Sequence, residues 1–182
     1  MTWNTALFKF VFSFAHRSFL LDSFGVFLAE YLPYFLGAAA LLFLFAEKNG
    51  RRRWFYFAEM ALSLILSRGL VTELIRFFYH HSRPFQVFGF EPLVQETLNN
   101  SFPSGHAAFL FALAGVFLFL NRRWGWYFIL FALVNGLARV FCGVHWPLDI
   151  FGGAVIGILC GTIVHKLLEP SLKAISSTQI SP

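Results

Sequence analysis

The sequence has few charged residues and little cysteine. Only 13% of its 182 residues are charged, whereas 58% are hydrophobic. This composition is typical of an integral membrane protein. Its two cysteines, Cys142 and Cys160, lie within or close to apolar stretches, so we expect buried thiols and neither a disulfide nor a metal pair. Zinc-ligand spacing is missing as well, which argues against a zinc-binding module.

Polar stretches long enough for a soluble domain are also missing. The chain instead offers apolar runs near the ~20 residues that a helix needs to cross the hydrocarbon core of a bilayer. These runs lie at 24–46, 54–79, 106–120, 125–143 and 148–168. We therefore expect an all-α, multi-pass protein whose chemistry takes place in or beside the membrane.

The first twenty residues differ from these runs. Their polar residues fall on one helical stripe, which predicts an amphipathic helix lying in the interface. A cleaved signal peptide is not favoured, because no positive charge precedes the apolar stretch. Asp22 and Ser23 offer N-cap chemistry to the first spanning helix. The chain thus divides into an interfacial helix (1–20), a transmembrane domain (21–169) and a polar C-terminal tail (170–182).

Basic residues indicate the orientation. They gather at 48–53, at 122–123 and at 166–173, which share one side of the membrane if five helices cross. The positive-inside rule makes that side cytoplasmic and places the N-terminal helix on the opposite face of the cell membrane. The net charge of +5 is then a topology signal, and nucleic acid is not expected as a partner.

Three short polar clusters stand at the extracytoplasmic ends of the apolar runs. The first contains Arg76 and Arg83, seven residues apart and so nearly on one face if the helix persists to Pro84. Either arginine alone would be expected to snorkel to lipid headgroups. Together with the other clusters, they suggest a site that binds an anion.

The second cluster is Pro103-Ser104-Gly105-His106, directly before an apolar run. Ser104 can cap the following helix, whose first turn would present free backbone N–H groups to a phosphate. Gly105 lets an anion approach the backbone closely. An ordinary serine cap explains these two residues equally well. It does not explain His106, whose imidazole can donate a proton to a leaving group.

The third cluster joins Arg139, His145 and Asp149. Asp149 falls in the first turn of a helix opened by Pro147, so a capping role is one interpretation. The alternative pairs it with His145. A carboxylate that accepts the hydrogen of one imidazole nitrogen leaves the other nitrogen free as a nucleophile.

The three clusters resemble the three signatures of the type 2 phosphatidic acid phosphatase superfamily, whose helical core is shared with vanadium haloperoxidases. The resemblance extends over about residues 20–168 and implies five transmembrane helices. Two positions depart from the family pattern, since Arg76 stands where the family usually has Lys and Ala138 where it usually has Ser. A planar guanidinium changes the geometry of phosphate binding, and Ala138 removes one hydrogen-bond donor.

The resemblance also implies a mechanism. His145 attacks phosphorus to give a phosphohistidine, Asp149 orients His145, and His106 protonates the departing oxygen. The phosphoryl oxygens are held by Arg76, Arg83, Ser104, Gly105 and Arg139. Neither a metal nor another cofactor is expected, because arginines and a helix N-terminus supply the positive charge.

The expected substrate is a membrane lipid. Among the branches of the family, the chain most resembles bacterial undecaprenyl-diphosphatases, which recycle the carrier lipid of peptidoglycan synthesis. The alternatives are phosphatidylglycerophosphate, phosphatidate or lipid A phosphatases, and a non-catalytic protein that binds or transports a lipid phosphate. The loop from Phe85 to Phe102 either lines a groove for the lipid tail or anchors itself to the interface. Its apolar members are Phe85, Phe88, Phe90, Leu93, Val94, Leu98 and Phe102.

Further residues are candidates for supporting roles. Glu30, Arg68 and Glu73 fall within apolar runs, where a lone charge is costly, so we expect them to be paired or to lie near the polar pocket. Glu73, three residues before Arg76, can orient it, and Glu30 and Pro103 are the other supporting candidates.

Other polar residues are expected to have structural roles. The adjacent His80 and His81 would point in different directions on a helix, so we expect them at the interface and not as ligands. Glu59, nearer the cytoplasmic end of its run, is expected at the interface. Gly153, Gly157 and Gly161 leave a smooth stripe on the last helix, where we expect a helix of the same chain to pack.

Overall fold

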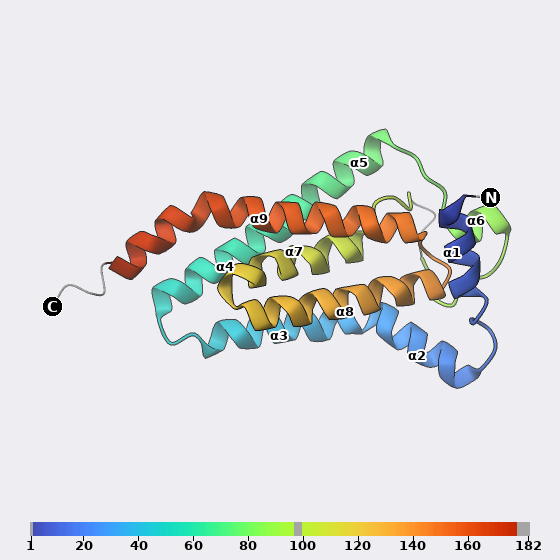
Figure 1. The fold of residues 1–182 in the computed structure, drawn as a ribbon, viewed down its shortest axis with the longest axis horizontal. Coiled ribbons are helices and arrows are strands. Elements are labelled where there is room, and N and C mark those ends of the chain that lie inside the picture. Colours follow the sequence, from blue (N-terminus) through green and yellow to red (C-terminus); the bar gives the residue numbers. More distant parts are fainter. Residues whose placement is uncertain (1, 97–99, 178–182) are drawn as a thin grey trace.

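The computed structural model describes residues 2–96 and 100–177 of the chain, and most of these residues form helices (Figure 1). The helices are α1 (Trp3–Phe12), α2 (Phe19–Glu30), α3 (Leu32–Ala46), α4 (Gly50–Leu64), the π-helix η1 (Ile65–Val71), α5 (Thr72–Phe78), α6 (Pro84–Phe88), α7 (Gly105–Leu120), α8 (Arg122–Phe141) and α9 (Pro147–Ser177).

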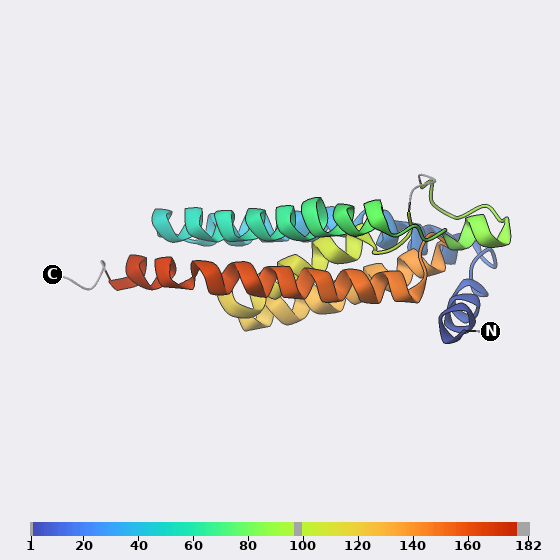
Figure 2. The same cartoon turned by 90° about the horizontal axis from the view of Figure 1, so that it is seen from above.

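The long helices run side by side in an elongated bundle (Figures 1 and 2). α7 is its centre, since eleven of its residues from Gly105 to Phe117 are buried and it packs most extensively against α9 and α8. α1 and α6 lie together at one end of the bundle, where α5 and α8 end and where α7 and α9 begin. The loops that carry the three polar clusters therefore meet at this end.

Small residues allow α7 and α9 to approach closely. A Cβ atom at Gly157 would lie 2.6 Å from the carbonyl oxygen of Ala108, and one at Gly161 would lie 2.7 Å from that of Ala112. At Gly153 it would lie 2.5 Å from the carbonyl oxygen of Ser104. The expected intramolecular packing of the glycine stripe is thus confirmed.

In the part of the chain that the structure describes, two helices are long and apolar enough to cross a membrane alone. They are α8 and the part of α9 from Pro147 to Pro170. A third span results if α2 and α3, which meet at an angle of 43°, are taken together. The remaining predicted spans are also helical: α7 is a shorter apolar helix, and α4, η1 and α5 follow one another from Gly50 to Phe78.

Several expected boundaries differ from the structure. The first long helix begins at Phe19 after Ser18, and Asp22 lies in its first turn, where its carboxylate accepts a hydrogen bond from the backbone N–H of His16 (3.0 Å). The N-terminal helix ends at Phe12 and is shorter than the expected segment 1–20. α9 continues to Ser177, so the predicted tail is helical as far as that residue, and residues 178–182 lie outside the described part.

Glu59 is not at the interface as expected. It is fully buried between α4 and α9, where its carboxylate contacts Nδ1 of His165 at 2.7 Å. The ring of His165 stacks on Phe119. Pairing with a second polar group lowers the high cost of placing a carboxylate among apolar helices.

Candidate active site

A polar pocket of about 420 Å³ lies at the end of the bundle where the three clusters meet. It combines four arginines and two histidines with two glutamates, in contrast to the apolar surroundings. Its lining consists of Pro33, Tyr34, Arg68, Glu73, Arg76, Arg83, Glu96, Gly105, His106, Phe109, Arg139 and His145. The pocket therefore collects residues from all three clusters, which are far apart in the sequence.

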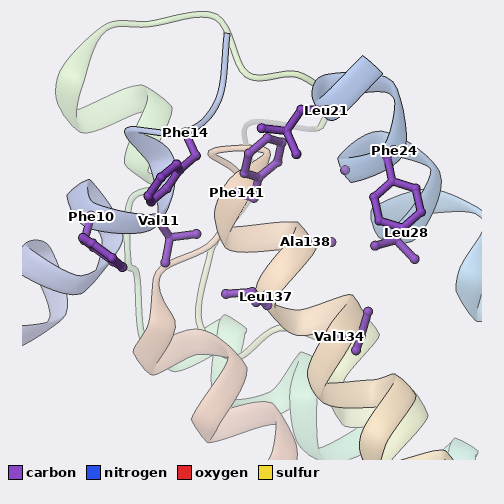
Figure 3. Close-up of a pocket in the computed structure, with 11 residues that line it drawn as sticks. Phe10, Val11, Phe14, Leu21, Phe24, Leu28, Val134, Leu137, Ala138 and Phe141 are labelled. Carbon is purple, nitrogen blue, oxygen red and sulfur yellow. The ribbon is translucent and has the colours of Figure 1, made fainter. Parts of the chain in front are cut away.

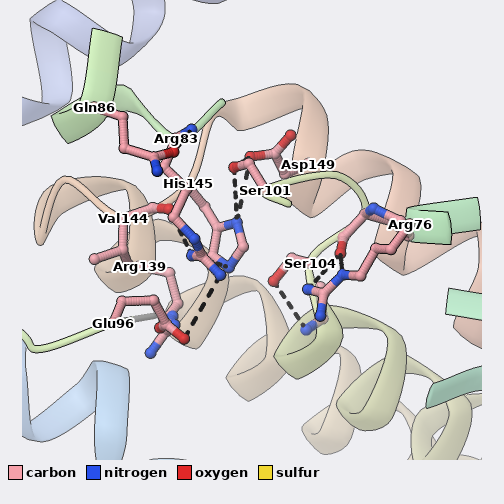
Figure 4. A network of polar contacts seen from close by, with 12 residues as sticks. Arg76, Arg83, Gln86, Glu96, Ser101, Ser104, Arg139, Val144, His145 and Asp149 are labelled. Carbon is pink, nitrogen blue, oxygen red and sulfur yellow. Dashed lines mark hydrogen bonds and ion pairs between the residues drawn. The ribbon is translucent and has the colours of Figure 1, made fainter. Parts of the chain in front are cut away.

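The buried imidazole of His145 has a different partner on each nitrogen. Its Nδ1 lies 3.3 Å from Oδ2 of Asp149, and its Nε2 lies 3.4 Å from Nη1 of Arg83 (Figure 4). Asp149 is fully buried at the start of α9, and Oδ2 also accepts hydrogen bonds from the backbone N–H of Trp146 (2.8 Å) and from the hydroxyl of Ser101. This arrangement favours a proton on Nδ1 and leaves the lone pair of Nε2 directed towards the pocket.

Two buried arginines stand beside this nitrogen. Arg83 donates to the carbonyl oxygen of Val144 (3.0 Å), and Arg139 near the end of α8 forms an ion pair with Glu96. The second carboxylate oxygen of Glu96 lies 3.6 Å from Nη2 of Arg83. Glu96 thus bridges two guanidinium groups next to His145, as a bound anion would (Figure 4).

The charges at this end of the bundle shift one another's pKa values. Burial lowers the pKa of His145 to about 4, although the hydrogen bond with Asp149 opposes this shift. Burial also lowers the pKa of Arg83 to about 10. The pKa of Glu96 is raised by burial, but the positive charges of Arg139 and Arg83 outweigh this effect and lower it overall. His145 is therefore neutral and Glu96 ionised near neutral pH.

Arg76 forms the opposite side of the pocket. Its Nε and Nη2 donate to the carbonyl oxygen of Pro103 at 3.3 and 2.9 Å, and its Nη1 lies 3.4 Å from Glu73. Arg76 therefore holds the turn before α7, and Glu73 contacts Arg76 as the sequence suggested. Glu30, at the end of α2, does not belong to the residues that line the pocket among those described.

The turn before α7 brings its N-terminus to the pocket. The side chain of Ser104, fully buried, accepts a hydrogen bond from the backbone N–H of Ala107 (3.4 Å), as expected for a cap. Gly105 and His106 follow in the first turn and line the pocket. An anion there would meet free N–H groups and the positive end of the helix dipole.

Two expectations about the clusters are wrong. Arg76 and Arg83 do not share a helix, because α5 ends at Phe78 and Arg83 precedes the separate helix α6, which Pro84 opens. Ala138 does not face the polar pocket. It lines an apolar pocket between α1, α2 and α8 together with Phe141 and Val11 (Figure 3). A serine at this position would point away from the phosphate site.

Sequence reasoning missed three residues beside the site. Glu96 lies in a loop that carries no motif, and only the fold brings it to Arg139. Ser101 precedes the second cluster by two residues, and His81, expected at the interface, has its Nδ1 3.4 Å from Oδ1 of Asp149. The nearness of Ser101 to the motif was a usable signal, whereas the other two contacts depend on how the loops fold.

The loop from Phe85 to Phe102 packs on the N-terminal helix. The ring centroids of Phe90 and Phe12 are 4.3 Å apart, and Phe88 lies against Phe8 and Trp146. Leu98, expected to take part in this loop, lies outside the described residues. These contacts hold the described part of the loop against the N-terminal helix and Trp146.

Comparison with known proteins identifies the family of the chain. The model of the PAP2 superfamily matches residues 52–172. Undecaprenyl-diphosphatase BcrC of Bacillus subtilis is 32% identical, over 92% of this chain and 86% of its own length. The crystal structure of LpxE from Aquifex aeolicus superimposes with a TM-score of 0.73 at 29% identity, over 91% of this chain and 96% of that one.

A second solved structure supports the fold alone. The PAP2-type phosphatidylglycerolphosphate phosphatase of Bacillus subtilis superimposes with a TM-score of 0.65 at 21% identity, over 92% of this chain and 85% of that one. The helical bundle, the polar pocket at its end and the family match lead to one conclusion. The chain belongs to the PAP2 superfamily and is a lipid phosphatase of the membrane.

Proposed function

We propose that the protein hydrolyses undecaprenyl diphosphate to undecaprenyl phosphate and inorganic phosphate. The observation that carries the proposal is the polar pocket, in which four arginines surround two histidines beside apolar helices. The similarity to an undecaprenyl-diphosphatase over most of both chains supports the choice of this lipid.

The reaction begins at His145. Asp149 accepts a hydrogen bond from the Nδ1–H of His145. Nε2 attacks the terminal phosphorus, so that an N–P bond forms as the bond to the bridging oxygen breaks. His106 gives its proton to that oxygen as undecaprenyl phosphate leaves. Water then attacks the phosphohistidine and gives a proton to His106, so that the N–P bond breaks, phosphate is released and both imidazoles return to their starting states.

The arginines stabilise the transferred phosphoryl group. Arg83 and Arg139 stand next to His145. The phosphoryl oxygens lie between these two arginines, in the place that the carboxylate of Glu96 occupies in this structure. On the other side, Arg76 and the N-terminus of α7 at Gly105 supply positive charge, and Ser104 caps that helix. Charge aimed at the developing negative oxygens is the main source of catalysis in phosphoryl transfer.

The orientation is part of the proposal. We place five spans in the bilayer, formed by α2 with α3, by α4 with η1 and α5, and by α7, α8 and α9. The basic residues between these spans put the pocket at the extracytoplasmic face of the cell membrane. α1 would then lie in the interface next to the pocket, and the substrate would keep its tail in the bilayer.

The test uses purified protein in detergent with undecaprenyl diphosphate, phosphatidylglycerophosphate and phosphatidate as substrates. We expect the highest kcat/KM for the diphosphate, and the same rate with and without EDTA. His145→Ala should abolish phosphate release, whereas Arg122→Gln, at the opposite end of the bundle, should behave as wild type. Preference for a monoester would contradict the substrate, and full activity of His145→Ala or loss with EDTA would contradict the mechanism.

A further inference from the structure

Arg68 is a fourth arginine of the polar pocket that none of the three clusters contains. It lies within the π-helix η1, between α4 and α5, and lines the pocket with Arg76, Arg83 and Arg139. Short π-helical segments are rare and occur frequently at functional sites. An arginine held in such a segment at the pocket is therefore a candidate for binding a ligand.

The π-helical turn explains how Arg68 reaches the pocket. Its Nη1 donates to the carboxylate of Glu73, five residues later. In an α-helix, residues five apart point about 140° away from each other. The i→i+5 pattern of a π-helix brings them to one face. The local widening thus places Arg68 beside Glu73 and Arg76.

The guanidinium of Arg68 lies directly against the N-terminus of α7. A Cβ atom at Gly105 would lie 2.9 Å from Cδ and 3.0 Å from Cζ of Arg68, and closer still to Nε. Only glycine leaves room for this contact without a shift of the arginine. The side chain is 42% exposed, and Glu73 is its one hydrogen-bond partner among the described residues. Most of its N–H donors can therefore bind a ligand.

The proposed chemistry divides the pocket into two halves. The phosphoryl group that is transferred lies at His145, between Arg83 and Arg139. His106 must face the bridging oxygen, so the phosphate that stays on the lipid lies beyond His106. Arg68 contacts Gly105, the residue before His106, and stands on the side of the pocket formed by Arg76.

We propose that Arg68 binds the phosphate that remains on the lipid and so selects diphosphates over monophosphates. The proposal rests on the function proposed above. A guanidinium suits this task because its planar fork can contact two phosphate oxygens at once. Arg76 is less suited, because three of its donors are already directed to Pro103 and Glu73.

The test compares wild type with Arg68→Gln and Arg68→Lys on farnesyl diphosphate, and measures inhibition by orthovanadate, which fills a single phosphate site. For Arg68→Gln we expect kcat/KM to fall about 10- to 100-fold, as for loss of a charged hydrogen bond, while the inhibition constant of orthovanadate changes less than about threefold. Arg68→Lys should recover part of the loss. Arg122→Gln serves as the matched control.

The other outcomes distinguish a failure of the role proposed for Arg68 from a failure of the proposed function. Equal weakening of turnover and orthovanadate binding, or no change in either, would contradict the role of Arg68, provided that the thermal midpoint of the variant matches that of wild type. If Arg68→Gln does not fold, Arg68→Lys replaces it in the comparison. Its kcat/KM should then fall by a smaller factor than expected for Arg68→Gln, while the inhibition constant of orthovanadate stays close to that of wild type. No hydrolysis of farnesyl or undecaprenyl diphosphate by wild type would contradict the proposed function itself.

Discussion

The imidazole of His145 connects a carboxylate, a hydroxyl and a guanidinium within one buried cluster. Nδ1 lies 3.3 Å from Asp149 and 3.4 Å from the hydroxyl of Ser101, while Nε2 faces Arg83. A histidine whose Nδ1 is held by a carboxylate keeps the lone pair on Nε2, so it can attack through Nε2 at an anion drawn to the neighbouring guanidinium. Small changes of charge around His145 should therefore alter both anion binding and the stability of the fold.

The pH dependence of stability tests the burial of His145. Its pKa is about 4 in the folded protein and about 6.5 when unfolded. The unfolded chain therefore takes up a proton first as the pH falls, and stability is lost between about pH 6.5 and 4, by up to about 3 kcal/mol. His145→Gln should remove this part of the loss, which thermal unfolding at a series of pH values measures. The exposed His16→Gln should keep the wild-type dependence.

Glu96 lies between two arginines, at the position that the proposed mechanism gives to the phosphoryl group. In Glu96→Gln the carboxylate charge is lost while the shape is retained, so Arg83 and Arg139 attract an anion more strongly. We expect the inhibition constant of orthovanadate to decrease about 3- to 10-fold, equivalent to about 1 kcal/mol. Glu91→Gln, an exposed residue of the same loop, is the control. Unchanged or weaker inhibition in Glu96→Gln would show that Glu96 does not occupy the phosphoryl position.

Single residues differ in how well the sequence predicts them. The residues of the three clusters could be placed in one site because their spacing at helix ends is specific. Glu96 could not, because its ion pair with Arg139 depends on the path of a loop that carries no motif. His81 looked like an interfacial residue, since nothing in its neighbourhood indicates Asp149 as a partner.

At the scale of helices, the close contact of α7 and α9 holds the second and third clusters together. Backbone N–H of Ser104 donates to the carbonyl oxygen of Asp149 (3.0 Å), so the two N-termini are joined directly. The glycines of α9 make this approach possible. Packing at these glycines should therefore determine both stability and the geometry of the pocket.

Gly157→Ala tests this packing. The new methyl group would meet the carbonyl oxygen of Ala108 at 2.6 Å and the backbone nitrogen of Ala112 at 2.7 Å, and neither can move without shifting α7. We expect a loss of about 1–3 kcal/mol, measured by thermal unfolding in detergent. Gly37→Ala in α3, where a Cβ atom meets nothing within 4 Å, is the matched control and should be neutral or stabilising. Equal stability of both variants would contradict the packing argument.

Helices were more predictable than their irregularities. Each apolar run corresponds to one helix or to two or three consecutive helical segments, because burial in lipid leaves few other choices for the backbone. The bend between α2 and α3 and the π-helix η1 were not predicted. An extra residue in a helical turn leaves no mark in hydropathy. The charge of Arg68 within an apolar run predicted a polar partner or a place near the pocket, whereas the π-helical turn that pairs it with Glu73 comes from the structure.

For the whole molecule, the pocket lies at the end of the elongated bundle where α7 and α9 begin. The basic residues at 48–53 and 122–123 lie around the starts of α4 and α8, at the other end (Figure 1). The proposed orientation predicts which loops face the cytoplasm. Cysteine introduced at the exposed Gln95 should react with an impermeant maleimide in intact cells, and cysteine at the exposed Arg122 only after permeabilisation. The native Cys142 and Cys160 are buried and should stay unlabelled. The reverse labelling pattern would place the pocket at the cytoplasmic face of the membrane.

The proposed mechanism depends on a phosphohistidine at His145, and this intermediate can be trapped. Purified protein is mixed with polyprenyl diphosphate labelled with ³²P in the terminal phosphate, quenched with alkali within milliseconds and digested. We predict a label that is stable to alkali and lost in acid, located on the peptide with His145 and missing in His145→Gln. Turnover of the wild type without such a label, or a label that persists in His145→Gln, would contradict the account.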